Sequence, residues 1–197
     1  GHVRSAYTHN NLGLLYRLME RYDDAERHYL RAVEIRRKHL DSDHPLIAYT
    51  LDNLALLYLR TGRPDDAEPV LEEVLETGAR AFGEESGDYG FFLSNVAWMR
   101  ELQGRWDEEL TARQRVLTIY ENAYGAESPQ LIGPLRHLGR NLVRVDRPQE
   151  AAEPFRRAIA LLEAANDERD ADLLESTRAA LDDVLSPSGD APVSGDE

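Results

Sequence analysis

Acidic side chains and imidazoles are the groups most able to do chemistry in this 197-residue chain, because it contains no cysteine. Its sequence therefore offers no disulfide, thiolate nucleophile or cysteine-bound zinc. Adjacent acidic residues, a common source of general acids and bases, recur as Asp23-Asp24, Asp65-Asp66 and Asp107-Glu108. Each pair follows a turn and would lie in the first turn of a helix, where negative charge favours the helix dipole. We interpret these pairs as helix-starting residues and expect no catalytic residues and no enzyme activity.

Histidine offers another route to a functional site, as a metal ligand. His39 and His44 lie five residues apart across a loop that also holds two aspartates. An acidic turn between repeats explains this arrangement without a metal ion. His9 and His28 have no further ligand at helical spacing. We therefore expect no metal site and no cofactor.

Arginines form a cationic stripe near the end of the chain. The stripe consists of Arg136, Arg140 and Arg144, with His137 beside it. Residues at i, i+4 and i+8 share one face of a helix, and a row of guanidiniums can hold carboxylates or phosphates through paired hydrogen bonds. The alternative is a solvated face paired with acidic residues of the neighbouring capping helix at 168–185, such as Glu175 and Asp182.

A repeated unit of 42 residues positions these side chains. One short motif recurs as Asn11-Leu12-Gly13, Asn53-Leu54-Ala55, Asn95-Val96-Ala97 and His137-Leu138-Gly139. In the second repeat, apolar residues recur at i, i+3, i+4, i+7 and i+8 from Leu51 to Leu59, which is typical of an amphipathic helix. A fixed period of this length, with two helices in each unit, indicates a helical solenoid.

The period predicts the organisation of the whole chain. We expect a solenoid domain over 1–185, with repeats at about 2–43, 44–85, 86–127 and 128–167 and a capping helix at 168–185. The predicted fold is all-α, a right-handed superhelical solenoid of four antiparallel helix pairs plus this C-terminal capping helix. Residues 186–197 are rich in Pro, Ser, Gly and acidic residues, a composition typical of a disordered tail.

The repeated motif resembles the tetratricopeptide repeat over roughly residues 2–165. The resemblance is clearest in Asn11, Leu12, Gly13, Tyr16, Ala25, Tyr29 and Ala32. The 42-residue period, with a His-Pro or Ser-Pro step before the first helix of a pair, is more similar to the kinesin-light-chain type. The third repeat departs most from the pattern, with Arg100, Glu109 and Arg113 at positions of the family's Tyr, Ala and aromatic residue. We therefore expect less tight packing within the third pair.

In that family, the first helices of the pairs line a concave groove that binds extended peptides. The resemblance implies that Asn11, Asn53 and Asn95 follow a peptide backbone, with His137 interrupting the series. An amide side chain both donates and accepts hydrogen bonds, so a row of asparagines suits a peptide backbone of any sequence. The alternative, that these asparagines brace the packing between helices, stays open.

Apolar residues are expected on the same groove face. They are Tyr7, Tyr49 and Phe91 at one equivalent position, and Leu14, Leu56 and Trp98 at another. Exposed aromatic side chains are effective anchors for partners, although each residue could equally belong to the core between repeats. With the arginine stripe at the other end, the groove would suit a peptide with apolar residues followed by acidic ones.

Charge and hydropathy restrict the class of partner. The formal net charge of −14 favours repulsion from nucleic acid and from anionic membranes. No apolar run approaches the roughly 20 residues that span a bilayer, and the start of the chain does not resemble a signal peptide, so we expect a cytoplasmic location.

These patterns together predict a non-catalytic protein–protein interaction scaffold that binds a peptide or partner segment. One alternative is a sensor or regulatory module of a larger protein that carries a nucleotide-binding or effector domain. Another is self-assembly, because the first helix of the N-terminal repeat has no covering helix. The expected state is a monomer, or weak self-association through this N-terminal repeat.

Overall fold

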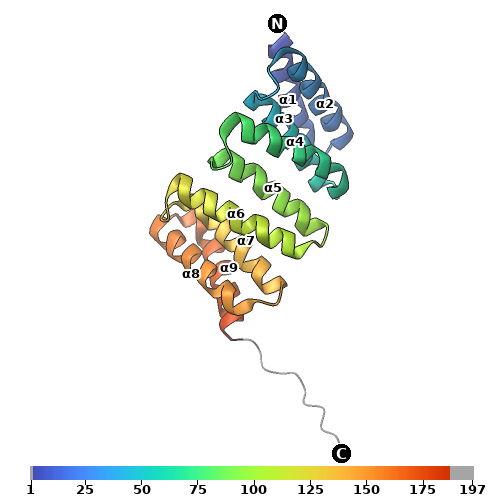
Figure 1. Cartoon of the computed structure of the whole chain (residues 1–197). Coiled ribbons are helices and arrows are strands. Elements are labelled where there is room, and N and C mark those ends of the chain that lie inside the picture. Colours follow the sequence, from blue (N-terminus) through green and yellow to red (C-terminus); the bar gives the residue numbers. More distant parts are fainter. Residues whose placement is uncertain (1, 187–197) are drawn as a thin grey trace, which may run out of the picture. The chain divides into compact units, whose positions relative to one another are not determined.

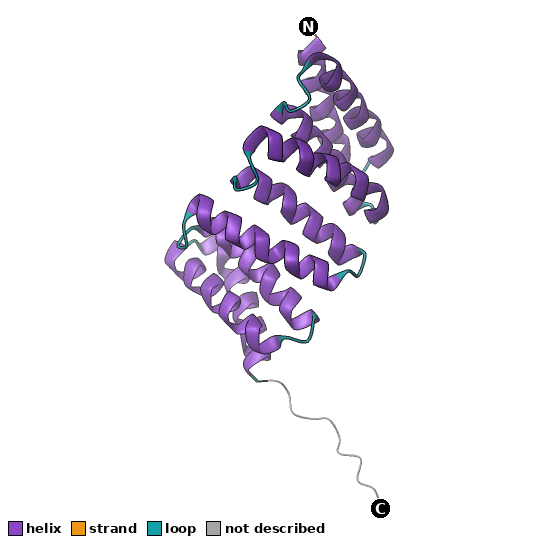
Figure 2. Ribbon diagram, viewed as in Figure 1, coloured by secondary structure: helices purple, strands orange, loops and turns teal. Residues whose placement is uncertain are grey.

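The computed structural model describes residues 2–186, and this part of the chain contains helices and turns but no strand (Figure 2). Its α-helices are α1 (His2–Leu18), α2 (Tyr22–His39), α3 (Pro45–Arg60), α4 (Pro64–Phe82), α5 (Gly87–Leu102), α6 (Trp106–Tyr124), α7 (Ile132–Arg144), α8 (Pro148–Ala165) and α9 (Ala171–Leu185) (Figure 1). Short 3-10 turns, Pro129–Leu131 and Glu168–Asp170, precede α7 and α9. The predicted all-α fold, with four helix pairs and a capping helix, is confirmed. The predicted tail, apart from Ser186, lies outside the described residues.

The helices belong to two compact units. In the first unit, α1 packs on α2, α3 on α4 and α5 on α6, and neighbouring pairs meet where α2 contacts α3 and α4 contacts α5. In the second unit, α7 packs on α8, and α9 covers α8.

Each helix pair turns through a residue in the left-handed backbone conformation. The φ angles at this turn are 58° for Glu20, 71° for Gly62, 71° for Gly104 and 59° for Asp146. The four residues are one repeat period apart. Glycine adopts this conformation without steric cost, so the first and fourth turns accept a strain that the second and third avoid.

A small residue on the first helix of a pair lets a large residue of the second helix approach closely. A Cβ atom added to Gly13 would lie 2.7 Å from the ring of Tyr29, and one added to Gly139 would lie 2.6 Å from the ring of Phe155. Glycine is therefore required for the close approach of the first and fourth pairs. The equivalent residues of the second pair are Ala55 and Leu71, and both belong to one buried core cluster.

The third pair has a buried charge at the position where the other pairs have Tyr29, Leu71 and Phe155. Arg113, which occupies the position of Tyr29, is almost fully buried. Its Nε donates to Glu109 Oε1 at 3.2 Å, and its Nη2 donates to Glu101 Oε2 at 3.3 Å. Charge pairing thus accommodates the residues that led us to expect less tight packing.

Candidate functional site

The first helices of the three pairs in the first unit present equivalent residues on one face. This face, here called the A-helix face, comprises Tyr7, Asn11 and Leu14 of α1, Tyr49, Asn53 and Leu56 of α3, and Phe91, Asn95 and Trp98 of α5. Two hydrogen bonds, from Asn53 to α1 and from Asn95 to α3, each join residues 43 positions apart. The three helices therefore pack in the same register.

The three aromatic residues at the first equivalent position of the A-helix face are open to solvent. Tyr7 is 45% exposed, Tyr49 is 36% exposed and Phe91 is 42% exposed. Leu14 is also exposed, whereas Leu56 is half-buried. An apolar surface with aromatic members at three equivalent positions can take up apolar side chains of a partner.

Tyr49 and Phe91 both pack against the buried ring of Phe92. The ring of Phe92, which is fully buried, lies 5.5 Å from the Tyr49 ring and 5.9 Å from the Phe91 ring, in edge-to-face geometry. The Tyr49 hydroxyl donates a hydrogen bond to Asp88. Burial raises the pKa of Tyr49 to about 12, and the Asp88 carboxylate contributes to the increase. Tyr49 is therefore a neutral, oriented side chain at physiological pH.

Trp98 is less accessible than we expected for a binding residue. It is half-buried and packs against the core cluster that contains Leu57 and Met99. Leu18 and Leu102, one turn beyond Leu14 and Trp98, are exposed and were missed by the sequence reasoning. Extending each predicted position by four residues would have found them, because i and i+4 share one helix face.

The asparagines differ in how far they are available. Asn11 is exposed, whereas Asn53 is half-buried and its Nδ2 donates to Asn10 Oδ1 at 3.2 Å. Asn95 is buried, and its Nδ2 donates to Asp52 Oδ1 at 2.7 Å. The alternative interpretation, bracing between helices, thus describes Asn53 and Asn95 in this structure.

Asp52 is a buried carboxyl that the sequence reasoning did not single out. It is only 3% exposed and lies on α3, where the amide of Asn95 from α5 contacts it. Burial raises the pKa of Asp52 to about 7, while the hydrogen bond from Asn95 acts in the opposite direction. Aligning the repeats could have identified Asp52, because it occupies the position that Asn10 occupies in the first repeat.

The arginine stripe of α7 is divided between two roles. Arg136 Nε donates to Thr177 Oγ1 at 2.7 Å, and its Nη2 donates to Ser176 Oγ at 3.2 Å, so it binds hydroxyls of α9 and not the acidic residues suggested by the sequence. Burial lowers the pKa of Arg136, and the nearby Arg140 guanidinium lowers it further. Arg140, Arg144 and His137 are exposed on α7. Arg136 therefore contacts the capping helix, as the alternative interpretation expected, although through hydroxyl groups and not through carboxylates.

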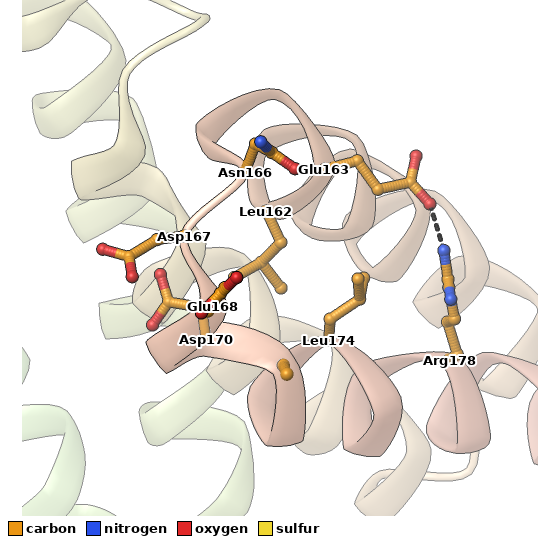
Figure 3. Close-up of a pocket in the computed structure, with 9 residues that line it drawn as sticks. Leu162, Glu163, Asn166, Asp167, Glu168, Asp170, Leu174 and Arg178 are labelled. Atoms are coloured by element: carbon orange, nitrogen blue, oxygen red, sulfur yellow. Dashed lines mark hydrogen bonds and ion pairs between the residues drawn. The ribbon is translucent and has the colours of Figure 1, made fainter.

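Two cavities lie at opposite ends of α9. One, of about 390 Å³, is lined by Arg140, Val143, Arg144, Pro148, Phe155, Ala180, Asp183 and Val184. The other, of about 440 Å³, lies where α8 leads into α9 and carries an acidic rim (Figure 3). In this second cavity Arg178 Nη2 donates to Glu163 Oε1 at 2.5 Å.

His9 and His28, for which we expected no metal-site partner, contact each other between α1 and α2. Their Nδ1 atoms are 2.8 Å apart, and the Tyr16 ring stacks on His28. Burial lowers the pKa of His9, and the charges of His28 and Arg31 act in the same direction. No group of three or more potential metal-ligating residues occurs in the described part of the chain.

Comparisons with known proteins place the fold. The sequence model of the tetratricopeptide repeat matches residues 4–78 and 92–164. No curated protein sequence matches the chain significantly. Among the described residues, no helix is both long and apolar enough to cross a membrane.

Several solved structures are similar to this chain. The nearly identical TPR-like repeats of a protein assigned as a kinesin light chain in Podosopora anserina give a TM-score of 0.79 at 20% identity, with 96% of this chain and 89% of that chain covered. BtubC (BKLC) from P. vanneervenii gives 0.65 at 22% identity, covering 98% and 68%. Pseudomonas aeruginosa pilF gives 0.67 at 20% identity, covering 95% and 70%. With a family match over most of its length, the chain belongs to the tetratricopeptide-repeat family, and its fold is similar to that of kinesin-light-chain-like repeats.

Proposed function

We propose that this protein is a non-catalytic, cytoplasmic protein–protein interaction module that binds an extended partner segment on the A-helix face. The observation that carries the proposal is the exposure of Tyr7, Tyr49 and Phe91 at one equivalent position of three helices that pack in register. Tetratricopeptide repeats are protein-interaction folds, and a row of exposed aromatic side chains supplies anchors at regular intervals.

The chemistry of the face favours a partner with apolar side chains. Phe91 and Tyr49 are oriented by the buried Phe92, so they lose little conformational freedom on binding. Asn11 adds an exposed amide that can donate to and accept from a peptide backbone. The partner is therefore expected to be an extended segment with apolar residues at intervals.

Fluorescence titration tests this proposal. Trp98, in a Trp106→Phe background, reports on the face while a library of short peptides with apolar residues followed by acidic ones is added. We expect a saturable change in emission with at least one peptide. Replacing Phe91 with alanine should weaken that binding about tenfold or more, because it removes one of the three aromatic anchors.

Leu30→Ala provides the matched control, since Leu30 is an equally exposed apolar residue on α2, outside the A-helix face. It should leave the affinity unchanged. Equal losses in the two variants, or no response to any peptide by a folded protein, would contradict binding at this face.

A further inference from the structure

In the first unit, the two interfaces between successive helix pairs contain an equivalent side-chain contact. The ring of Tyr58 is buried against α2, and its hydroxyl donates to Glu26 Oε1 at 2.9 Å. One period later, Arg100 Nη1 donates to Glu68 Oε1 at 2.5 Å. In both interfaces, a long side chain of the first helix meets a glutamate of the preceding second helix.

At the interface between α8 and α9, the residues equivalent to the two partners of this contact are both small. Val184 occupies the position of Tyr58, and Ala152 occupies the position of Glu26, three periods further along the chain. Val184 and Phe155 line the cavity of about 390 Å³ described above. The long side chain that the first unit has at this position is therefore replaced in this interface by a short one that lines a cavity.

The charges at the rim of this cavity, here called the α9 cavity, indicate what it can bind. Arg140 and Arg144 face one acidic residue, Asp183, and Arg136 lies one turn from Arg140. The Arg140 guanidinium is exposed and makes no hydrogen bond or ion pair within the described part of the chain. An exposed guanidinium beside an apolar cavity can pair with a carboxylate through two hydrogen bonds.

The cavity at the other end of α9 has the opposite charge and serves as an internal comparison. Asp167, Glu168 and Asp170 surround it, and its arginine, Arg178, points toward Glu163 (Figure 3). A carboxylate ligand would be repelled there. Charge complementarity therefore selects the α9 cavity for an acidic ligand.

We propose that the α9 cavity binds a partner segment in which a bulky apolar side chain lies beside a carboxylate, with Arg140 pairing with the carboxylate. The apolar side chain enters the space between Val143, Phe155 and Val184. This assignment rests on the proposed function as a protein-binding module, and it places a second contact of that module in the second unit.

Methyl NMR of the full chain tests the assignment. The protein is labelled at its valine methyl groups, and the signals of Val143 and Val184 are identified by substitution with isoleucine. The probe is the peptide acetyl-Gly-Leu-Glu-Glu-Gly-amide. We expect saturable shifts of both signals, and affinities lower by about tenfold or more for versions with alanine in place of leucine or glutamine in place of glutamate.

Three variants locate the binding. Arg140→Gln should weaken binding of the glutamate peptide about tenfold, while Arg178→Gln, at the acidic cavity, should leave it unchanged. Val184→Tyr should fill the cavity, abolish the shift of Val143 and raise the melting temperature. Equal affinities for the three peptides, or undiminished binding by a folded Val184→Tyr protein, would overturn the proposal.

The proposal must also be distinguished from occupation of the cavity by the acidic residues that follow Ser186 in the sequence. A chain in which Asp190, Asp196 and Glu197 are replaced by their amides separates the two cases, because binding by this chain but not by the parent would assign the cavity to the protein's own tail and overturn the proposal. The fluorescence titration of Trp98 reports separately on the A-helix face, and Leu30→Ala, which lies in neither site, should leave the valine shifts unchanged. A failure of the α9 cavity therefore remains distinguishable from a failure of the proposed function.

Discussion

Asp52 shows how one residue changes the properties of a repeated contact. In the first repeat, Asn10 accepts a hydrogen bond from Asn53, so both partners are neutral amides. In the second repeat, the same contact pairs Asn95 with the buried carboxyl of Asp52. An amide does not titrate, whereas a buried carboxyl resists losing its proton. The second contact is therefore sensitive to pH and the first is not.

The pH dependence of stability should report on Asp52. Burial raises the pKa of Asp52 to about 7 from the usual 3.8, so the folded chain holds this proton more tightly than the unfolded chain. The contribution of Asp52 to the free energy of unfolding is therefore lost as the pH rises from about 4 to about 7. The loss is on the order of 3–4 kcal/mol. Urea denaturation at a series of pH values measures it.

Asp52→Asn is the variant that isolates this effect, because the first repeat already contains an amide at this position. The free energy of unfolding of the variant should change less between pH 4 and pH 7 and should exceed that of the parent at pH 8. Identical pH profiles for the two proteins would show that Asp52 ionises in the folded chain without cost.

At the scale of the helix pair, the turn is the element whose strain differs between repeats. Glu20 and Asp146 adopt the left-handed conformation that glycine supplies in the second and third pairs. For a residue with a Cβ, this conformation costs roughly 1–2 kcal/mol, less for aspartate than for most residues. Part of the gain from glycine is offset by its greater freedom in the unfolded chain.

Glu20→Gly and Asp146→Gly should therefore each stabilise the protein by about 0.5–1 kcal/mol, with the larger gain for Glu20. The reverse change, Gly62→Ala, should destabilise it through backbone strain alone, since an added Cβ would meet no atom within 4 Å. Thermal unfolding followed by circular dichroism measures all three. Destabilisation by both glycine variants would mean that the side chains of Glu20 and Asp146 contribute more than the strain costs.

The helix pairs were largely predictable from the sequence, and the polar contacts between them were not. Period and amphipathic spacing locate the α-helices of the described residues, because both are properties of the sequence near each residue. The bond from Arg136 to Thr177 depends on how α7 and α9 are rotated against each other, which spacing does not specify. The pairing of His9 with His28 across two helices was missed for the same reason.

The site was predictable only in part. Exposure at Tyr7 and Phe91 followed from the register of the family's groove. Burial of Asn95 follows from its hydrogen bond to Asp52, which lies one position before Asn53 in the preceding repeat. The α9 cavity was not predicted, although the replacement of a tyrosine by Val184 is visible when the repeats are aligned.

At the scale of the whole molecule, the same repeat position has different consequences at the end of the chain and in its middle. Leu15 of α1 is 50% exposed, whereas its equivalents Leu57 and Met99 are each 1% exposed. A preceding helix packs against the interior positions, and none of the described helices packs against Leu15 in this way. The energetic contribution of a repeat position thus depends on whether a neighbour covers it.

Leu57→Ala should lower the free energy of unfolding by about 2–5 kcal/mol, because it leaves a cavity in the core. Leu15→Ala should change it by less than about 0.5 kcal/mol, as is usual for exposed sites. Chemical denaturation of both variants measures the difference. A large loss in Leu15→Ala would indicate that the residue is covered in solution, as self-association through the N-terminal repeat requires, and light scattering at several concentrations would then show a mass above that of one chain.

The constant register between repeats has a consequence for how the chain folds. The contacts within a pair join residues 16 positions apart, as for Gly13 and Tyr29, and the amide contacts between pairs join residues 43 positions apart. No distant segment has to find its partner before these contacts form, so the entropy lost on closing each loop is small. Chains dominated by such short-range contacts fold quickly, and nucleation can begin at any pair and spread to its neighbours.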